Sequence, residues 1–269
     1  MSNIAIAFLM TAIAGLSTGI GSAIAFFTKS TSKRFLSVSL GFSAGVMIYV
    51  SMVEIFSKAQ ASLSSFLGAK NGTIATVAAF FGGMFLIAVI DKLIPSESNP
   101  HEFKSTAMDG TPGKSGKSRK SLMRTGLFTA LAIAIHNFPE GLATFVSALN
   151  DPTIAIPIVV AIAIHNIPEG IAVSVPIYYA TGSKKNAFLY SFASGLAEPL
   201  GALVGYLILL PFMNDLVYGI LFAAVAGIMV FISLDELLPA AEEYGEHHLS
   251  IYGLVSGMII MAVSLILFM

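Results

Sequence analysis

His136-Asn137-Phe138-Pro139-Glu140-Gly141 returns, with one residue changed, as His165-Asn166-Ile167-Pro168-Glu169-Gly170. The two phrases begin 29 residues apart, and each lies inside a long apolar stretch. An ionisable side chain at membrane depth is costly, so it usually faces the interior of a helix bundle and has a partner there. A third acid, Glu198, lies in the next apolar stretch. The sequence therefore predicts one polar site shared by neighbouring helices.

The composition indicates the class of protein. Of the 269 residues, 56% are hydrophobic and only 11% are charged, whereas soluble domains carry about 25% charged residues. This is the composition of an integral membrane protein. The net charge of −1 gives no reason to expect nucleic-acid binding, and the absence of cysteine excludes disulfides and thiolate metal ligands.

A membrane-spanning helix needs about 20 mostly apolar residues. We expect an all-α integral membrane protein, a single transmembrane transport domain over residues 1–269, with the polar site in a bundle of its second, fourth, fifth and sixth helices. The first stretch is too long for a signal peptide and has no basic residue before it, so it is interpreted as a membrane helix. Eight spans are predicted, at residues 4–28, 35–57, 74–94, 123–149, 154–180, 187–210, 216–239 and 250–269.

Residues 95–122 are rich in Ser, Gly, Lys and Pro, which predicts a flexible loop. With alternating spans, every Lys and Arg except Lys58 and Lys70 falls on the side of this loop. The excess of basic residues predicts that this side is cytoplasmic and that both termini lie outside. Glycines four residues apart, such as Gly41 and Gly45, favour close packing within one bundle over the face of a homodimer, which stays open.

Each repeated phrase places several metal-ligand types on one helical sector. The histidine and the glutamate are four residues apart and share a face, and the asparagine lies three residues before the glutamate. Each of the three acids is next to a proline, namely Pro139, Pro168 or Pro199. A proline removes one helical hydrogen bond and favours a kink, and such interruptions often mark the substrate sites of transporters.

Imidazole nitrogens with carboxylate oxygens suit zinc, and also iron, manganese or cobalt. Three neighbouring carboxylates repel one another, and a divalent cation relieves that repulsion. The ligands suffice for two ions bridged by Glu140 and Glu169, or for one ion with a changing coordination shell. A site without thiolate should release its ion, as transport requires.

Three other interpretations remain open at this stage. A proline-flanked glutamate could be a protonated structural residue, although a repeated phrase makes that less attractive. An intramembrane metal-dependent hydrolase would also need buried His and Glu, but the sequence contains no HExxH. A proton-coupled carrier of an organic solute would use the acids for protons and the histidines as a switch.

The phrases HNFPEG and HNIPEG, the Ser194-Gly-Leu-Ala-Glu198 segment and the Leu234-Asp-Glu-Leu-Leu-Pro239 segment closely resemble the ZIP family of divalent metal transporters. The resemblance covers essentially the whole chain, and its compact bacterial type fits best. It implies eight helices, both termini outside a bacterial inner membrane, no cofactor, and uptake of Zn²⁺ and of other ions such as Fe²⁺, Mn²⁺, Co²⁺ or Cd²⁺. It also implies metal ligands at His136, Asn137, Glu140, His165, Asn166, Glu169 and Glu198, with Glu54 near the outer site.

The expected route starts outside at Glu54 and crosses the site by alternating access. Asp91, Asp235 and Glu236 would then receive the ion at the cytoplasmic ends of their helices, although interfacial charges in headgroup water explain them as well. His247 and His248 are expected to be a solvated loop pair. The long loop holds only one histidine, His101, which argues against metal capture there.

Overall fold

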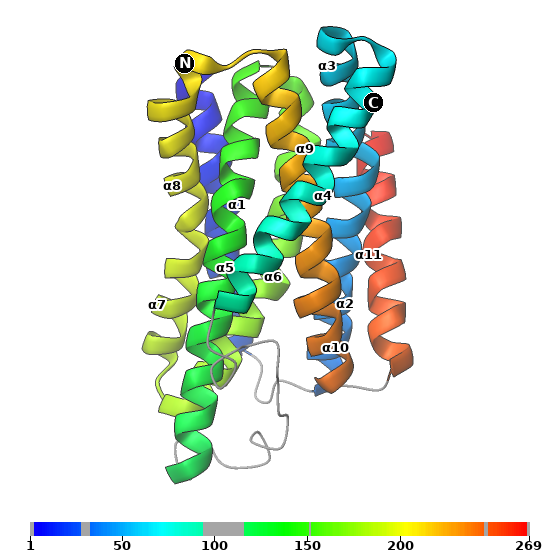
Figure 1. Cartoon of the computed structure of the whole chain (residues 1–269). Helices are drawn as coiled ribbons and strands as arrows, with labels where there is room; N and C mark the ends of the chain where they lie inside the picture. Colours follow the sequence, from blue (N-terminus) through cyan, green and yellow to red (C-terminus); the bar gives the residue numbers. More distant parts are fainter. Residues whose placement is uncertain (1–2, 28–32, 94–115, 151, 245–246, 268–269) are drawn as a thin grey trace.

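The computed structural model describes residues 3–27, 33–93, 116–150, 152–244 and 247–267. These residues form helices joined by short connections, and none of them lies in a β-strand. Figure 1 shows two bundles side by side, with the described ends of the first and last helices at the same end of the molecule.

The first bundle, on the left in Figure 1, is built around the two longest helices, α5 and α6, which are consecutive in the chain. It contains α1 (Asn3–Phe27), α5 (Gly116–Asn150), α6 (Pro152–Thr181), α7 (Lys184–Gly195) and α8 (Ala197–Val204). The last of these continues through a π-helical turn, η4 (Gly205–Leu209), and a 3₁₀ turn, η5 (Leu210–Phe212).

The second bundle lies on the right in Figure 1 and contains two helices with π-helical turns. It comprises α2 (Lys33–Tyr49), η1 (Val50–Ile55), α3 (Phe56–Leu67), α4 (Ala69–Leu93), α9 (Asp215–Ile232), η6 (Ser233–Leu237), α10 (Leu238–Tyr244) and α11 (His247–Leu267). α2 also packs against α6 of the first bundle and so connects the two.

Glycine faces bring α2 and α11 into close contact. A Cβ at Gly41 or Gly45 would collide with the backbone of α11, and one at Gly253 or Gly257 would collide with the backbone of α2. Helices in lipid associate through such small residues because their backbones can then approach closely. The predicted packing of these glycines within one bundle is therefore confirmed.

Seven helices of the described residues are long and apolar enough to cross a membrane. They cover residues 3–23, 34–67, 69–92, 155–181, 184–212, 215–243 and 248–267. The remaining predicted span, 123–149, falls within α5. The chain is thus an all-helical, multi-pass membrane protein, and the count of eight spans stays a prediction.

Several predicted boundaries were wrong. The second helix does not end at residue 57 but continues to Leu67, where Gly68 with φ 82° turns the chain directly into α4. The predicted loop 95–122 ends sooner, because residues 116–122 belong to α5 and contain no proline to stop a helix. The rest of that loop, including His101, lies outside the described residues. His247 and His248 begin α11 rather than forming a loop pair, and the exposed His248 ring stacks on Tyr252.

Only one of the three prolines beside the acids lies at a break between helices. Pro199 follows a break in the sixth predicted span, since α7 ends at Gly195 and α8 begins at Ala197. Proline has no N–H to donate to the carbonyl four residues earlier, which is the carbonyl of Gly195. Pro139 and Pro168, by contrast, lie within the uninterrupted helices α5 and α6.

Candidate metal site

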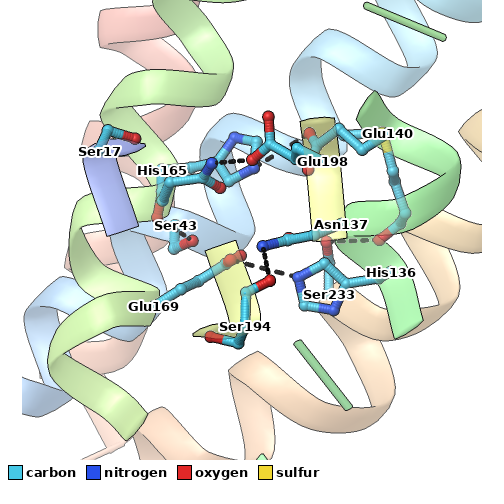
Figure 2. Close-up of polar contacts among 12 residues, drawn as sticks. Ser17, Ser43, His136, Asn137, Glu140, His165, Glu169, Ser194, Glu198 and Ser233 are labelled. Carbon is cyan, nitrogen blue, oxygen red and sulfur yellow. Dashed lines mark hydrogen bonds and ion pairs between the residues drawn. The ribbon is translucent and has the colours of Figure 1, made fainter. Parts of the chain in front are cut away.

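The two repeated phrases meet because α5 and α6 form a helical hairpin. α5 ends at Asn150 and α6 begins at Pro152, and the two helices pack together along their lengths. This places the phrase of one helix beside that of the other, far from either helix end. Figure 2 shows their side chains converging in one buried cluster with Glu198 of α8. All seven predicted side chains of the phrases and of α8 are at most 1% exposed.

Each histidine pairs with the glutamate of the other helix. His136 Nε2 lies 3.2 Å from Glu169 Oε2, and His165 Nε2 lies 3.2 Å from Glu140 Oε1. The sequence placed each histidine on the same face as its own glutamate, and the structure crosses these partners between α5 and α6. α5 and α6 run antiparallel, so the histidine that begins one phrase lies at the level of the glutamate near the end of the other.

The asparagines and Glu198 occupy the adjoining part of the cluster. Asn166 Nδ2 donates a short hydrogen bond to Glu198 Oε1 and a second one, of 3.0 Å, to the carbonyl oxygen of Ala14. Asn137 Nδ2 donates to the carbonyl oxygen of Ser194 at 3.4 Å. Both amide groups are therefore held through their nitrogens, which leaves the amide oxygens available as ligands.

Every one of the seven side chains keeps a buried polar atom without a hydrogen-bond partner. These atoms are His136 Nδ1, Asn137 Oδ1, both carboxylate oxygens of Glu140, both ring nitrogens of His165, Asn166 Oδ1, Glu169 Oε1 and Glu198 Oε2. The contact between His165 and Glu140 thus lacks the geometry of a hydrogen bond, and it is an ion pair when the imidazole is protonated. Buried polar groups are nearly always hydrogen-bonded, so a concentration of exceptions needs an explanation. All of these atoms are oxygens or imidazole nitrogens, which are donors that divalent metals accept.

The cluster is not closed around a single point. Within the ranges that the structure describes, no three His, Asp or Glu side chains form a group that could hold a metal ion as they stand. The carboxylates and imidazoles instead face one another in pairs. Binding of an ion would require at least one pair to open.

Sequence reasoning missed the residues that hold this cluster from other helices. Ser43 of α2 donates from Oγ to the carbonyl oxygen of His165 at 3.1 Å, which links the second bundle to the site. Ala14 of α1 and Ser194 of α7 contribute the carbonyl oxygens that fix the two asparagines. Gly41 and Gly45 face α11, whereas Ser43 lies on a different face of α2, so the glycine spacing gave no signal for it.

The other predicted residues lie apart from the crossed pairs. Glu54, on the π-helical turn η1, forms an ion pair with Lys58 and is partly exposed. Glu236, on the π-helical turn η6, is only 5% exposed and interacts electrostatically with His136. It is therefore not an interfacial charge in headgroup water, whereas its neighbour Asp235 and Asp91 of α4 are half-buried.

The fold and the buried cluster together indicate the class of protein. The chain is a multi-pass helical membrane protein whose buried histidines, asparagines and glutamates lie within its spanning helices, an arrangement that marks ion and substrate pathways.

Comparison with known proteins gives the family. Residues 93–265 match the model of the ZIP zinc transporter family. The chain is 71% identical to the zinc transporter ZupT of Streptococcus mutans, over 97% of each chain. It is 63% identical to the zinc transporter ZupT of Clostridium perfringens, over 100% of this chain and 98% of the relative, and 64% identical to that of Oceanobacillus iheyensis, over 99% of both.

The chain therefore belongs to the ZIP zinc transporter family. It is a transporter and not an enzyme, as the sequence predicted, and the intramembrane hydrolase finds no support among these relatives.

Proposed function

We propose that this protein carries Zn²⁺ across a bacterial inner membrane into the cytoplasm, through the cluster of α5, α6 and α8. The observation that carries the proposal is the concentration in that cluster of buried oxygens and imidazole nitrogens without hydrogen bonds. Relatives at 60% identity and above are named zinc transporters. The donor set contains no sulfur from cysteine, so it suits an ion that must later be released.

Zinc binding in this proposal replaces the two crossed ion pairs. The ion binds the imidazole nitrogens and carboxylate oxygens that now face each other across α5 and α6. Its positive charge then stabilises the buried carboxylates, as the paired imidazoles do in its absence. Asn137, Asn166 and Glu198 provide an adjoining set of oxygens. Two ions bridged by Glu140 and Glu169, or one ion passing between the two sets, both fit this donor arrangement.

Two further acids, Glu54 and Glu236, lie at the two ends of the proposed route. The ion enters near Glu54, whose carboxylate must first leave Lys58. It leaves toward Glu236, a buried acid that interacts with His136. Movement of the first bundle, which holds the cluster, against the second exposes the cluster to one side at a time, since transporters alternate access largely by rigid movement of one helix bundle against another. Fe²⁺, Mn²⁺, Co²⁺ and Cd²⁺ fit the same nitrogen and oxygen donors.

The test is labelled zinc uptake into proteoliposomes by the wild type and by Glu169→Gln. The substitution keeps the size of the side chain but removes its charge, and we expect uptake to fall to the level of empty liposomes. Asp215→Asn is the matched control, because this exposed acid at the start of α9 lies outside the cluster, and its uptake should equal that of the wild type. Saturable uptake at the wild-type rate by Glu169→Gln would contradict the proposal.

A further inference from the structure

One face of α5 stays polar on both sides of the candidate metal site. Thr129 lies seven residues before His136, and Ser147 lies seven residues after Glu140. Because α5 is one uninterrupted helix, these spacings place the four side chains within about 40° of one another around its axis. Each of them is at most 4% exposed. This polar stripe is about 27 Å long, close to the roughly 30 Å thickness of the hydrocarbon core of a bilayer.

The repeated phrase on α6 has no such continuation. The equivalent positions there are Ile158, seven residues before His165, and Pro176, seven residues after Glu169. Ile158 is buried in a small apolar cluster between α1 and α6. The phrase with the metal-ligand residues therefore does not require polar side chains at this spacing, and the polar stripe is a property of α5.

The two hydroxyl groups of the polar stripe differ from those that bond to their own helix. Serine and threonine side chains within helices can donate to a carbonyl oxygen three or four residues earlier. The buried Thr76 of α4 and Ser174 of α6 do so, at 2.8 and 3.3 Å. By contrast, Thr129 Oγ1 and Ser147 Oγ have no hydrogen-bond partner among the described residues. A buried hydroxyl group without a protein partner calls for a water molecule or an ion.

The polar stripe faces the second bundle. Tyr218 of α9 lies next to Ser147, although without the geometry of a hydrogen bond, and the charge of Glu54 on η1 acts on the same phenol. Further along the stripe, Glu236 of η6 interacts electrostatically with His136. Because α9, η1 and η6 all belong to the second bundle, the stripe lies along the boundary between the two bundles, where the proposed movement would open a path.

We propose that the polar stripe of α5 is the track along which the ion crosses the membrane, with Ser147 as an oxygen ligand on the Glu54 side of the cluster and Thr129 on the other side. This inference rests on the proposed function. A hydroxyl oxygen has lone pairs for a partly hydrated cation but no charge. Conduction needs positions that an ion enters readily and leaves readily, and a neutral oxygen provides such a position. Between ions, water occupies the track and hydrogen-bonds to the hydroxyl groups.

Access of water to the polar stripe can be tested without a transport assay. The chain has no cysteine, so Ser147→Cys and Thr129→Cys each introduce a single thiol. In nanodiscs without metal, both thiols should react with a small cationic methanethiosulfonate reagent several-fold faster than those of Ser174→Cys and Thr76→Cys. These two control positions are also buried, but their native hydroxyl groups bond to their own helices. Equal rates at all four positions would overturn the proposal.

Uptake into proteoliposomes tests the role of the hydroxyl groups in transport. Ser147→Ala and Thr129→Val should each lower the rate at saturating zinc several-fold, while zinc binding to the purified variants stays unchanged because the cluster is intact. Ser147→Thr keeps the hydroxyl group and should retain the wild-type rate, as should the matched controls Ser174→Ala and Thr76→Val. Wild-type rates in Ser147→Ala and Thr129→Val would overturn this inference alone, whereas absence of uptake by the wild type would overturn the proposed function.

Discussion

At the scale of single residues, the crossed pairs explain why two carboxylates and two imidazoles are tolerated in an apolar interior. His136 pairs with Glu169 and His165 with Glu140, and each pair joins two helices. Removing one member of a buried ion pair is costly because the other remains buried and uncompensated. In the proposed function a metal ion takes the place of that partner, so the same residues would serve the protein with and without its substrate.

Substitution of His165 tests the donor chemistry. His165→Asp exchanges an imidazole nitrogen for carboxylate oxygens, and harder ions such as Mn²⁺ prefer oxygen. We expect zinc to lose its advantage over manganese in competition uptake assays. The control is His248→Asp, an exposed histidine of α11 outside the cluster. An unchanged ranking of metals in His165→Asp would show that His165 is not a ligand.

The sequence was sufficient to predict which side chains gather, because a four-residue spacing fixes the face of a helix. It did not predict which histidine meets which glutamate. That choice depends on how α5 and α6 slide and rotate against each other, and long-range contacts determine this. Ser43 shows the same limit, since its bond to His165 needs α2 to lie against α6.

At the scale of the elements, glycines set the distances that align the cluster. Gly170 follows Glu169 on α6 and faces α1, and its carbonyl oxygen accepts hydrogen bonds from Ser22 of α1 and Ser191 of α7. A Cβ at Gly170 would collide with the carbonyl oxygen of Thr18. The closing glycine of the phrase therefore fixes three helices around the site, which the sequence alone did not reveal.

Gly170→Ala should lower the stability of the protein. The added methyl group meets backbone, which cannot rotate away, and overpacking of this kind costs about 1–3 kcal/mol. Gly82→Ala is the matched control, because a Cβ added there would have no neighbouring atom within 4 Å; helix propensity favours that change by up to about 1 kcal/mol. Thermal unfolding in detergent measures both, and equal unfolding temperatures would contradict the assigned contact.

At the scale of the whole molecule, the basic residues and the chain ends predict one orientation. The described ends of α1 and α11 lie at the same end of the bundles (Figure 1). Lys184, at the start of α7, is on the side that the basic residues predict to be cytoplasmic. In this orientation the proposed uptake through the cluster would run from the side of the termini toward the side of Lys184.

The absence of cysteine makes this orientation easy to measure. With Asn3→Cys, a membrane-impermeant maleimide should label intact cells, and with Lys184→Cys it should label only after lysis. The unsubstituted chain is the control and should take no label. Labelling of Lys184→Cys in intact cells would reverse the orientation and the inferred direction of transport.

The central claim is that zinc is bound by the histidines and glutamates of the crossed pairs, and X-ray absorption at the zinc edge tests it most directly. The wild type loaded with zinc should show nitrogen and oxygen neighbours at about 2.0–2.2 Å, with the scattering pattern of imidazole. The double variant His136→Asn, His165→Asn should lose that pattern. Imidazole scattering that persists in the double variant would place the zinc elsewhere and contradict the account.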